Sequence, residues 1–147
     1  MSGGAEAASG PKSAEFNAEN ASAGKIVVLD PGHGGAATVG GSSPTNATGP
    51  GGTLEKTLTL DVAQRTKAIL EDRGFTVLMT RNTDVNLSLS ARAAVARIAG
   101  AAAFVSIHFN ASNSHIAQGT ETLVHNSLSD GPHHSKALCR AVQAEMV

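Results

Sequence analysis

Two histidines and one glutamate occupy positions at which their side chains could meet. His33 lies in the turn that follows the apolar run 26–29, and His108 directly follows the apolar segment 101–107, whereas Glu55 lies in the first turn of a predicted helix. In a parallel α/β sheet the carboxyl ends of the strands and the N-termini of the following helices lie at one edge, so we expect the three side chains to converge. Two imidazoles and a carboxylate with an open fourth position form a catalytic zinc arrangement, which a hydrolase uses to lower the pKa of bound water to about 7.

The residues around His33 predict a tight turn at the end of a strand. Pro31 has no N–H to continue a hydrogen-bonded ladder, so the strand should end there. The neighbouring glycines let the backbone turn sharply and leave His33 without bulky neighbours. Asp30 is either a fourth ligand or, as we favour, a residue that orients His33 or caps the turn.

Other chemistry fits these residues less well. His33 alone would be a turn histidine bonded to the backbone, and Glu55 alone would be a favourable charge at a helix N-terminus, a role compatible with metal binding. A phosphate loop would need G-x-G-x-x-G or G-K-[ST], and neither is present. A Ser-His-Asp triad has no nucleophile elbow. Arg81, Asp84 and Arg92 are expected to form a structural ion pair or loop tie, with an arginine lining a substrate groove as the alternative. The remaining histidines are expected to be solvated: His115, His125, His133 and His134.

Alternating strand and helix patterns must position these residues. The apolar runs predict strands, and the apolar periodicity predicts helices. The strands are expected at 26–29, 75–80, 101–107 and 119–125, and the helices at 54–73, 87–99 and from Pro132 or His133 to the end. This alternation predicts right-handed βαβ crossovers and an α/β fold with a mostly parallel sheet sandwiched by helices. The glycine-rich loop 36–53, which follows His33, is expected to form one wall of the site.

Both long helices carry end signals and apolar stripes. Thr53 is the expected N-cap of the first, and Gly74 stands where a glycine commonly ends a helix. Gly100 is expected to end the second helix. The residues expected to face inward are Leu54, Leu58, Val62 and Ile69 of the first helix, with Leu60, Ala63 and Leu70 widening its stripe, and Leu89, Val95 and Ile98 of the second.

Composition limits the classes of partner. A net charge of −1 over 147 residues gives no basic footprint for nucleic acid or anionic membranes, and no window is long and apolar enough for membrane insertion. The lone Cys139 excludes an internal disulfide and a cysteine-rich zinc cage, and is expected to be an unreactive buried thiol. Residues 1–24 are expected to be a disordered or weakly ordered tail without a secretory signal, and 25–147 to be the folded domain.

Five blocks in the order of the sequence resemble one known family. They are K-I-V-V-L-D-P-G-H-G-G, L-E-K-T-L-T-L-D-V-A, G-F-T-V-L-M-T-R-N-T-D, L-S-A-R-A-A-V-A and F-V-S-I-H-F-N-A, with G-T-E-T matching a further strand. This pattern, from residue 25 to about 124, resembles the zinc-dependent N-acetylmuramoyl-L-alanine amidases of the amidase-3 type. The resemblance implies zinc on His33, Glu55 and His108, an α/β sandwich, and hydrolysis of the muramoyl–L-alanine amide of peptidoglycan.

One element of the family pattern has no counterpart in these residues. Family members carry a catalytic glutamate in a V-E-type motif on a later strand, which this sequence does not contain. We therefore expect an incomplete domain, with Glu121 as an in-chain carboxylate that could replace that base, although Glu121 matches the preceding strand block instead.

The sequence thus predicts a cell-wall amidase or autolysin acting in the cell envelope, periplasmic or extracellular, by an export route that it does not reveal. The alternative is a catalytically silent, zinc-containing peptidoglycan-binding or regulatory module. A third possibility is another zinc hydrolase, such as a carboxypeptidase or deacetylase. A sheet that lacks its last strand would expose an edge, so we also expect self-association or poor solubility.

Overall fold

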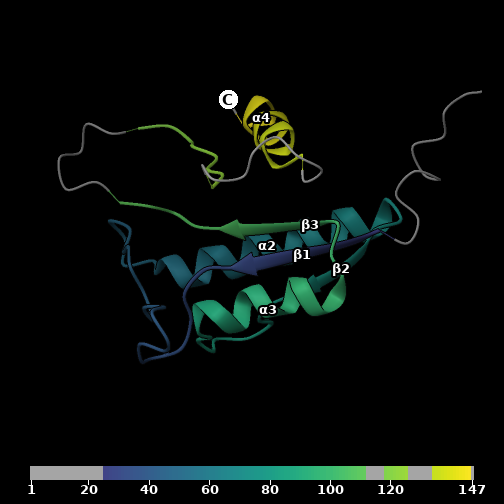
Figure 1. Cartoon of the computed structure of the whole chain (residues 1–147). Helices are drawn as coiled ribbons and strands as arrows, with labels where there is room; N and C mark the ends of the chain where they lie inside the picture. Colours follow the sequence, from purple (N-terminus) through teal and green to yellow (C-terminus); the bar gives the residue numbers. More distant parts are fainter. Residues whose placement is uncertain (1–24, 112–117, 126–133, 147) are drawn as a thin grey trace, which may run out of the picture. The chain divides into compact units, whose positions relative to one another are not determined.

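The computed structural model describes residues 25–111, 118–125 and 134–146. The predicted tail 1–24 lies outside these residues. The chain divides into two compact units, Met1–Ala111 and Ser112–Val147, and each is described by itself. The elements, labelled in Figure 1, are β1 (Ile26–Pro31), α2 (Glu55–Asp72), β2 (Thr76–Met79), α3 (Leu89–Ala99), β3 (Ala103–Ile107) and α4 (Ser135–Glu145).

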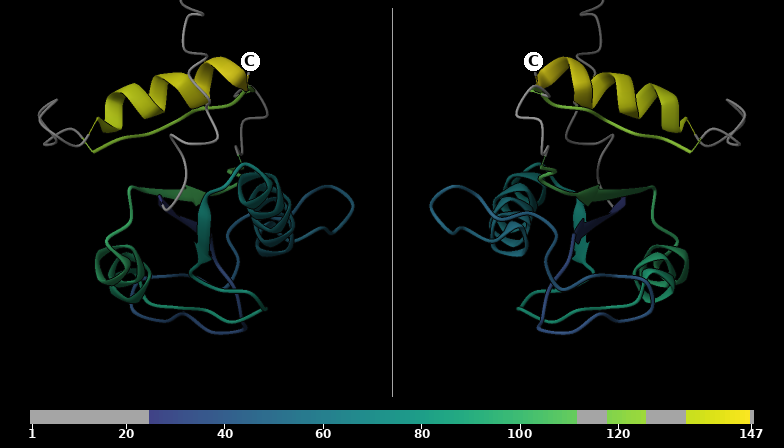
Figure 2. Two further views of the ribbon diagram at one scale, coloured as in Figure 1. Left: turned by 90° about the vertical axis from the view of Figure 1, so that its right-hand side faces the viewer. Right: turned by 90° about the vertical axis from the view of Figure 1, so that its left-hand side faces the viewer.

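The first unit contains a three-stranded parallel sheet with β1 in the centre, in the order β2-β1-β3. Val28 of β1 lies opposite Leu78 of β2 and Phe104 of β3. Helices α2 and α3 lie on opposite sides of this sheet (Figure 2). The predicted α/β class with a parallel sheet is therefore confirmed.

Strand β1 is buried on both faces, as its unbroken apolar run predicts. Leu29 packs with Ala63 of α2 and Val77 of β2 in the core on one side. Val28, whose side chain points to the opposite face because side chains alternate along a strand, is fully buried as well. The strand ends at Pro31, where the sequence places its end.

Helix α2 presents a stripe that matches the predicted one only in part, at Ala63 and Leu70. Its buried residues are Glu55, Thr59 and Ala63, whereas Leu58 and Ile69 are exposed. The predicted cap at Thr53 is also wrong, because Leu54 occupies the N-cap position and no side chain caps the helix. The stripe is displaced because polar residues of the first two turns, not leucines, face the end of β1.

Helix α3 ends at Gly100 as predicted, but it begins at Leu89, two residues after the predicted start, and buries a different face. The Ser88 hydroxyl accepts a hydrogen bond from the Ala91 N–H at 3.1 Å, and Gly100 adopts a left-handed φ of 59° at the other end. Leu89 and Ile98, predicted to face inward, are exposed, and Arg92 is buried in their place. An ion pair with Asp30, near the end of β1, makes the burial of Arg92 possible.

The second unit contains α4 and no strand among its described residues. The predicted strand 119–125 is wrong, because the described residues 118–125 pair with no other strand. Instead, the carbonyl groups of Thr120 and Thr122 accept hydrogen bonds from Gln143 Nε2 at 2.9 Å and Cys139 Sγ at 3.1 Å. Side chains of α4 thus replace the ladder, and Cys139 is half-buried rather than buried. Helix α4 starts at Ser135, after the predicted Pro132 or His133.

No helix among the described residues combines the length and apolarity needed to span a membrane.

Candidate metal centre

His33, Glu55 and His108 point three potential ligand atoms at one place in the first unit. His33 Nε2 lies 3.3 Å from Glu55 Oε1 and 3.1 Å from His108 Nδ1, and His108 Nδ1 lies 3.2 Å from Glu55 Oε1. These residues form a group able to hold a metal ion within the part of the chain that the structure describes. The turn after β1, the first turn of α2 and the end of β3 thus bring together the residues singled out in the sequence.

The spacing of the three atoms fits a tetrahedral metal ion. Ligand bonds of about 2.0–2.1 Å in a tetrahedron separate the ligand atoms by about 3.3–3.4 Å, close to the distances in this triangle. Imidazole and carboxylate donors suit zinc, and imidazole also suits iron, copper and nickel. The donor set therefore supports a divalent metal, and the geometry alone does not select one.

A hydrogen bond to Ser43 orients the ring of His33. Nδ1 of His33 lies 3.1 Å from the carbonyl oxygen of Ser43 and 3.1 Å from its hydroxyl oxygen. If Nδ1 is the donor to this carbonyl, the Nε2 lone pair faces Glu55 and His108. The contact of Ser43 was not predicted, since only the position of its loop shortly after His33 hints at it.

Asp30 does not orient His33 as predicted. Its carboxylate accepts hydrogen bonds from Thr80 Oγ1 at 2.6 Å, Ser106 Oγ at 2.7 Å and Arg92 Nη1 at 2.8 Å. Asp30 follows Val28 by two residues and so lies on the sheet face that α3 covers, away from the metal cluster. Asp30 is thus connected to the site through Arg92 and Ser106, not by contact with His33.

Main-chain groups hold the carboxylate of Glu55, which is almost fully buried. Oε1 accepts from the Phe109 N–H at 2.8 Å, and Oε2 accepts from the Ala47 N–H at 3.0 Å. The Glu55 N–H in turn donates to the Ala47 carbonyl at 3.0 Å. The loop 36–53, predicted as a wall of the site, thereby fixes the glutamate.

The turn that carries His33 adopts an unusual conformation. His33 has a left-handed φ of 62°, which costs a residue with a Cβ about 1–3 kcal/mol. Gly34 follows with a φ of 132°, and a Cβ there would lie 2.1 Å from the Val85 carbonyl oxygen. The surrounding structure must therefore hold this turn in place.

The site is open on one side. The side chain of His108 is 42% exposed, compared with 9% for His33 and none for Glu55. His108 is therefore the most solvent-accessible of the three side chains.

The charged residues predicted to tie loops do so with unpredicted partners. Asp84 pairs with Lys56 at 2.8 Å and accepts the Gly35 N–H at 2.8 Å. The pKa of the Asp84 carboxyl is lowered below its usual value, mainly by the hydrogen bond from Lys56 and also by the hydrogen bond from the Gly35 N–H. Arg92 forms an ion pair with Asp30. The pKa of Arg81 is lowered below its usual value, mainly because the side chain is buried and also because the positive charge of Arg92 lies nearby.

The other predicted site residues lie either in the second unit or outside the described residues. Glu121, His125 and His134 belong to the second unit, which is described by itself. His115 and His133 lie outside the described residues.

Comparisons with known proteins agree on one family. A family model described as N-acetylmuramoyl-L-alanine amidase matches residues 27–147. The amidase AmiC of Neisseria meningitidis is 43% identical over 102 residues, which cover 69% of this chain and 23% of that protein. The amidase LytC of Bacillus subtilis is 32% identical over 128 residues, which cover 87% of this chain and 24% of that protein. A crystal structure of an N-acetylmuramoyl-L-alanine amidase from Clostridium difficile is 30% identical, with a TM-score of 0.70, and the match covers 84% of this chain and 62% of that one.

The chain thus spans about a quarter of the length of these two curated relatives and 62% of that solved structure.

Proposed function

The chain belongs to the N-acetylmuramoyl-L-alanine amidase family of the amidase-3 type, and from that premise we propose that it hydrolyses peptidoglycan. The bond cleaved is the amide between the lactyl group of N-acetylmuramic acid and L-alanine. The observation that carries this proposal is the triangle of His33 Nε2, Glu55 Oε1 and His108 Nδ1, with sides of 3.1–3.3 Å.

The metal that we propose for this triangle is zinc, held by His33, Glu55 and His108. When bound there, zinc would supply Lewis-acid chemistry, namely polarisation of the amide carbonyl and a lowered pKa of bound water. The chain prepares the ligands: Ser43 sets the tautomer of His33, and the Phe109 and Ala47 amides fix Glu55. The exposed side of His108 leaves room for the substrate carbonyl.

Cleavage of the amide also needs a group that moves a proton to the leaving amine. Within these residues we propose Glu121 for this role. Replacing it by glutamine should abolish turnover while zinc content stays at one ion per chain. Turnover equal to that of the unchanged chain would exclude Glu121.

The experiment that tests the proposed function measures zinc content and release of stem peptides from purified cell wall on the same samples. We expect about one zinc per chain and free L-alanine termini on the released peptides, with both lost in His108→Ala. Products cleaved at another bond would indicate a carboxypeptidase or deacetylase instead. Absence of zinc from the unchanged chain would overturn the metal-dependent mechanism.

A second candidate is a catalytically silent module that keeps the zinc triangle and binds peptidoglycan. It would need only the group of His33, Glu55 and His108 that the structure brings together. Zinc binding and retention on insoluble cell wall without any peptide release would favour this candidate.

In either case we propose that 25–147 form the functional domain. Since peptidoglycan would be its substrate or its ligand, we propose the cell envelope as the place of action.

A further inference from the structure

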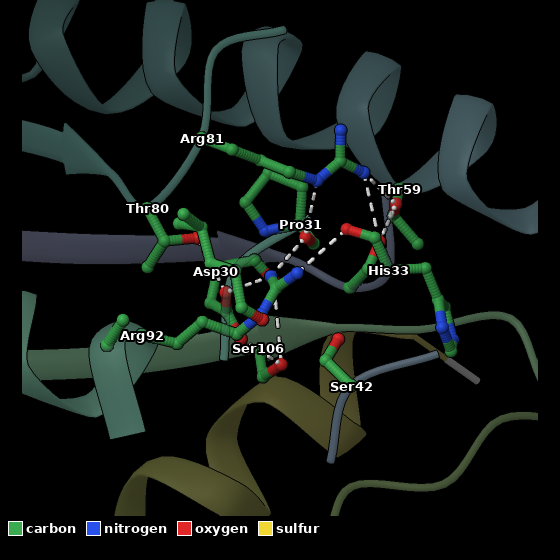
Figure 3. Close-up of polar contacts among 12 residues, drawn as sticks. Asp30, Pro31, His33, Ser42, Thr59, Thr80, Arg81, Arg92 and Ser106 are labelled. Carbon is green, nitrogen blue, oxygen red and sulfur yellow. Dashed lines mark hydrogen bonds and ion pairs between the residues drawn. The ribbon is translucent and has the colours of Figure 1, made fainter. Parts of the chain in front are cut away.

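Two buried arginines grip the turn that carries His33 from opposite faces of the sheet (Figure 3). From the face covered by α3, Arg92 Nη1 donates to Asp30 Oδ1 at 2.8 Å and to the Pro31 carbonyl at 2.9 Å, while Nη2 donates to the His33 carbonyl at 2.8 Å. Arg81 approaches from the face covered by α2. Arg92 is only 3% exposed and Arg81 only 2%, so water cannot replace the hydrogen bonds of these two side chains.

Arg81 connects this turn to the helix that carries Glu55. Its Nε donates to the Pro31 carbonyl at 2.9 Å, and its Nη2 donates to the Gly32 carbonyl at 2.9 Å. The same Nη2 lies 2.8 Å from the Lys56 carbonyl and 3.0 Å from the Thr59 hydroxyl, both in α2. The Thr59 hydroxyl donates to the Gly32 carbonyl at 2.9 Å, which closes the connection.

Arg92 connects the turn to the strand that carries His108. Its partner Asp30 also accepts from Ser106 Oγ at 2.7 Å, and Ser106 lies two residues before His108 in β3. Thr80, which follows β2, binds the same carboxylate at 2.6 Å. The arginines therefore join the three elements that bring the ligands together.

The chemistry of arginine suits this task. Three consecutive carbonyl groups, of Pro31, Gly32 and His33, accept from the two guanidinium groups, whose rigid forks present several donors at fixed angles. A buried carbonyl left without a partner would cost about 1–3 kcal/mol, so the forks favour this one path of the main chain. That path includes the left-handed φ of His33, which an unsupported turn would relax.

We propose that Arg81 and Arg92 are positioning residues that set the metal affinity of the site. They touch no ligand atom, and they act by holding the His33 turn, the start of α2 and the end of β3 in register. This inference rests on the proposed function only in taking His33, Glu55 and His108 as metal ligands.

The test compares Arg92→Lys and Arg81→Lys with the unchanged chain and with Arg65→Lys, a control on the exposed face of α2. Lysine keeps the charge but cannot form the fork. The probe is zinc alone, with apparent dissociation constants measured by competition with a chromophoric chelator below the melting temperature of each metal-free variant. We expect each of the two variants to bind zinc about 10–100-fold more weakly, the effect typical of groups that orient metal ligands, and Arg65→Lys to match the unchanged chain.

A second measurement separates positioning from a purely structural role. The visible spectrum of the cobalt-substituted protein reports ligand geometry, and a stability effect alone would not change it. We expect an altered spectrum for both lysine variants. Unchanged zinc affinity and cobalt spectrum in the folded variants would overturn the inference, as would equal weakening in Arg65→Lys.

If neither lysine variant folds without metal, Thr59→Val replaces them in the zinc-binding test. This variant loses only the hydroxyl that lies between Arg81 and the Gly32 carbonyl. Weaker zinc binding than in Arg65→Lys would support the inference, and equal binding would overturn it. If the unchanged chain itself bound no zinc, the proposed function would fail first. Zinc binding without peptide release would leave the inference intact and overturn only the proposed catalysis.

Discussion

Gly32 lies directly against the imidazole of His108: a Cβ at position 32 would stand 2.3 Å from Cε1 and 2.5 Å from Nε2 of that ring. The glycine was expected to leave room around His33, but the room it leaves is for His108. Gly32→Ala should therefore displace the ring from the triangle. We expect zinc affinity to fall at least about tenfold, the scale of effects on ligand orientation, in the chelator competition assay.

Gly51→Ala is the matched control, because no atom lies within 4 Å of the Cβ that it would add. Its zinc affinity should equal that of the unchanged chain. Equal affinity in Gly32→Ala as well would show that the ring of His108 is not needed in its present place.

Removal of the metal should destabilise the folded chain, and this effect should depend on Glu55 as a metal ligand. A ligand that binds only the folded state stabilises it, by about 4 kcal/mol at a concentration one thousand times its dissociation constant. Zinc should therefore raise the melting temperature of the unchanged chain, and a chelator should reverse the increase. Glu55→Gln should abolish the zinc-dependent increase, because the amide replaces the anionic ligand.

Glu71→Gln is the control for this experiment, because Glu71 pairs with Lys67 at the exposed end of the same helix. It should keep the full zinc-dependent increase in melting temperature. An equal increase in Glu55→Gln would place the metal elsewhere.

The sequence predicted the strands of the first unit and the edge where His33, Glu55 and His108 meet, because parallel topology determines where strand ends lie. It did not predict which face of each helix is buried. Apolar periodicity assigned Leu58 and Leu89 to the core, whereas Thr59 and Arg92 face the sheet. Hydrogen bonds to main-chain carbonyls decide these positions, and such bonds leave no periodic signal.

The contacts of Ser43 and Ala47 could not be predicted for a related reason. Both residues lie in a loop whose path depends on bonds to distant parts of the chain, such as those from Asn86 Nδ2 to the Ala37 and Ser42 carbonyls at 2.8 Å. Strand 119–125 was wrongly predicted because alternation alone cannot show whether a partner strand is present. In the structure, Gln143 and Cys139 occupy the carbonyls that a ladder would use.

Strand β3 provides a prediction about association. Among the described residues, β3 pairs with β1 alone, so its other edge has ladder groups that a second chain could use. We expect an average mass above that of the monomer at high concentration in size-exclusion chromatography with light scattering. A clean monomer over the same concentration range would contradict this expectation.

The tie between Asp84 and Lys56 should make stability depend on pH in a defined direction. The bond from Lys56 and that from the Gly35 N–H lower the pKa of Asp84 in the folded state below the value of about 3.9 expected when unfolded. A lowered folded-state pKa means that the contribution is complete above the unfolded pKa and disappears as the pH falls through the folded one. Asp84→Asn should therefore be less stable than the unchanged chain by about 0.2–1 kcal/mol at pH 6, the range for an exposed ion pair.

This difference should shrink below pH 4 and vanish once Asp84 is protonated in both states. Urea unfolding of the two proteins from pH 7 to pH 2.5 measures it. Repeating the comparison in a Lys56→Met background isolates the pair, since most of the difference should already be absent there at pH 6. If the difference in unfolding free energy stayed constant down to the lowest pH, the charge of the Asp84 carboxylate would not contribute to stability. The lower stability of Asp84→Asn would then come from the shape of the asparagine amide.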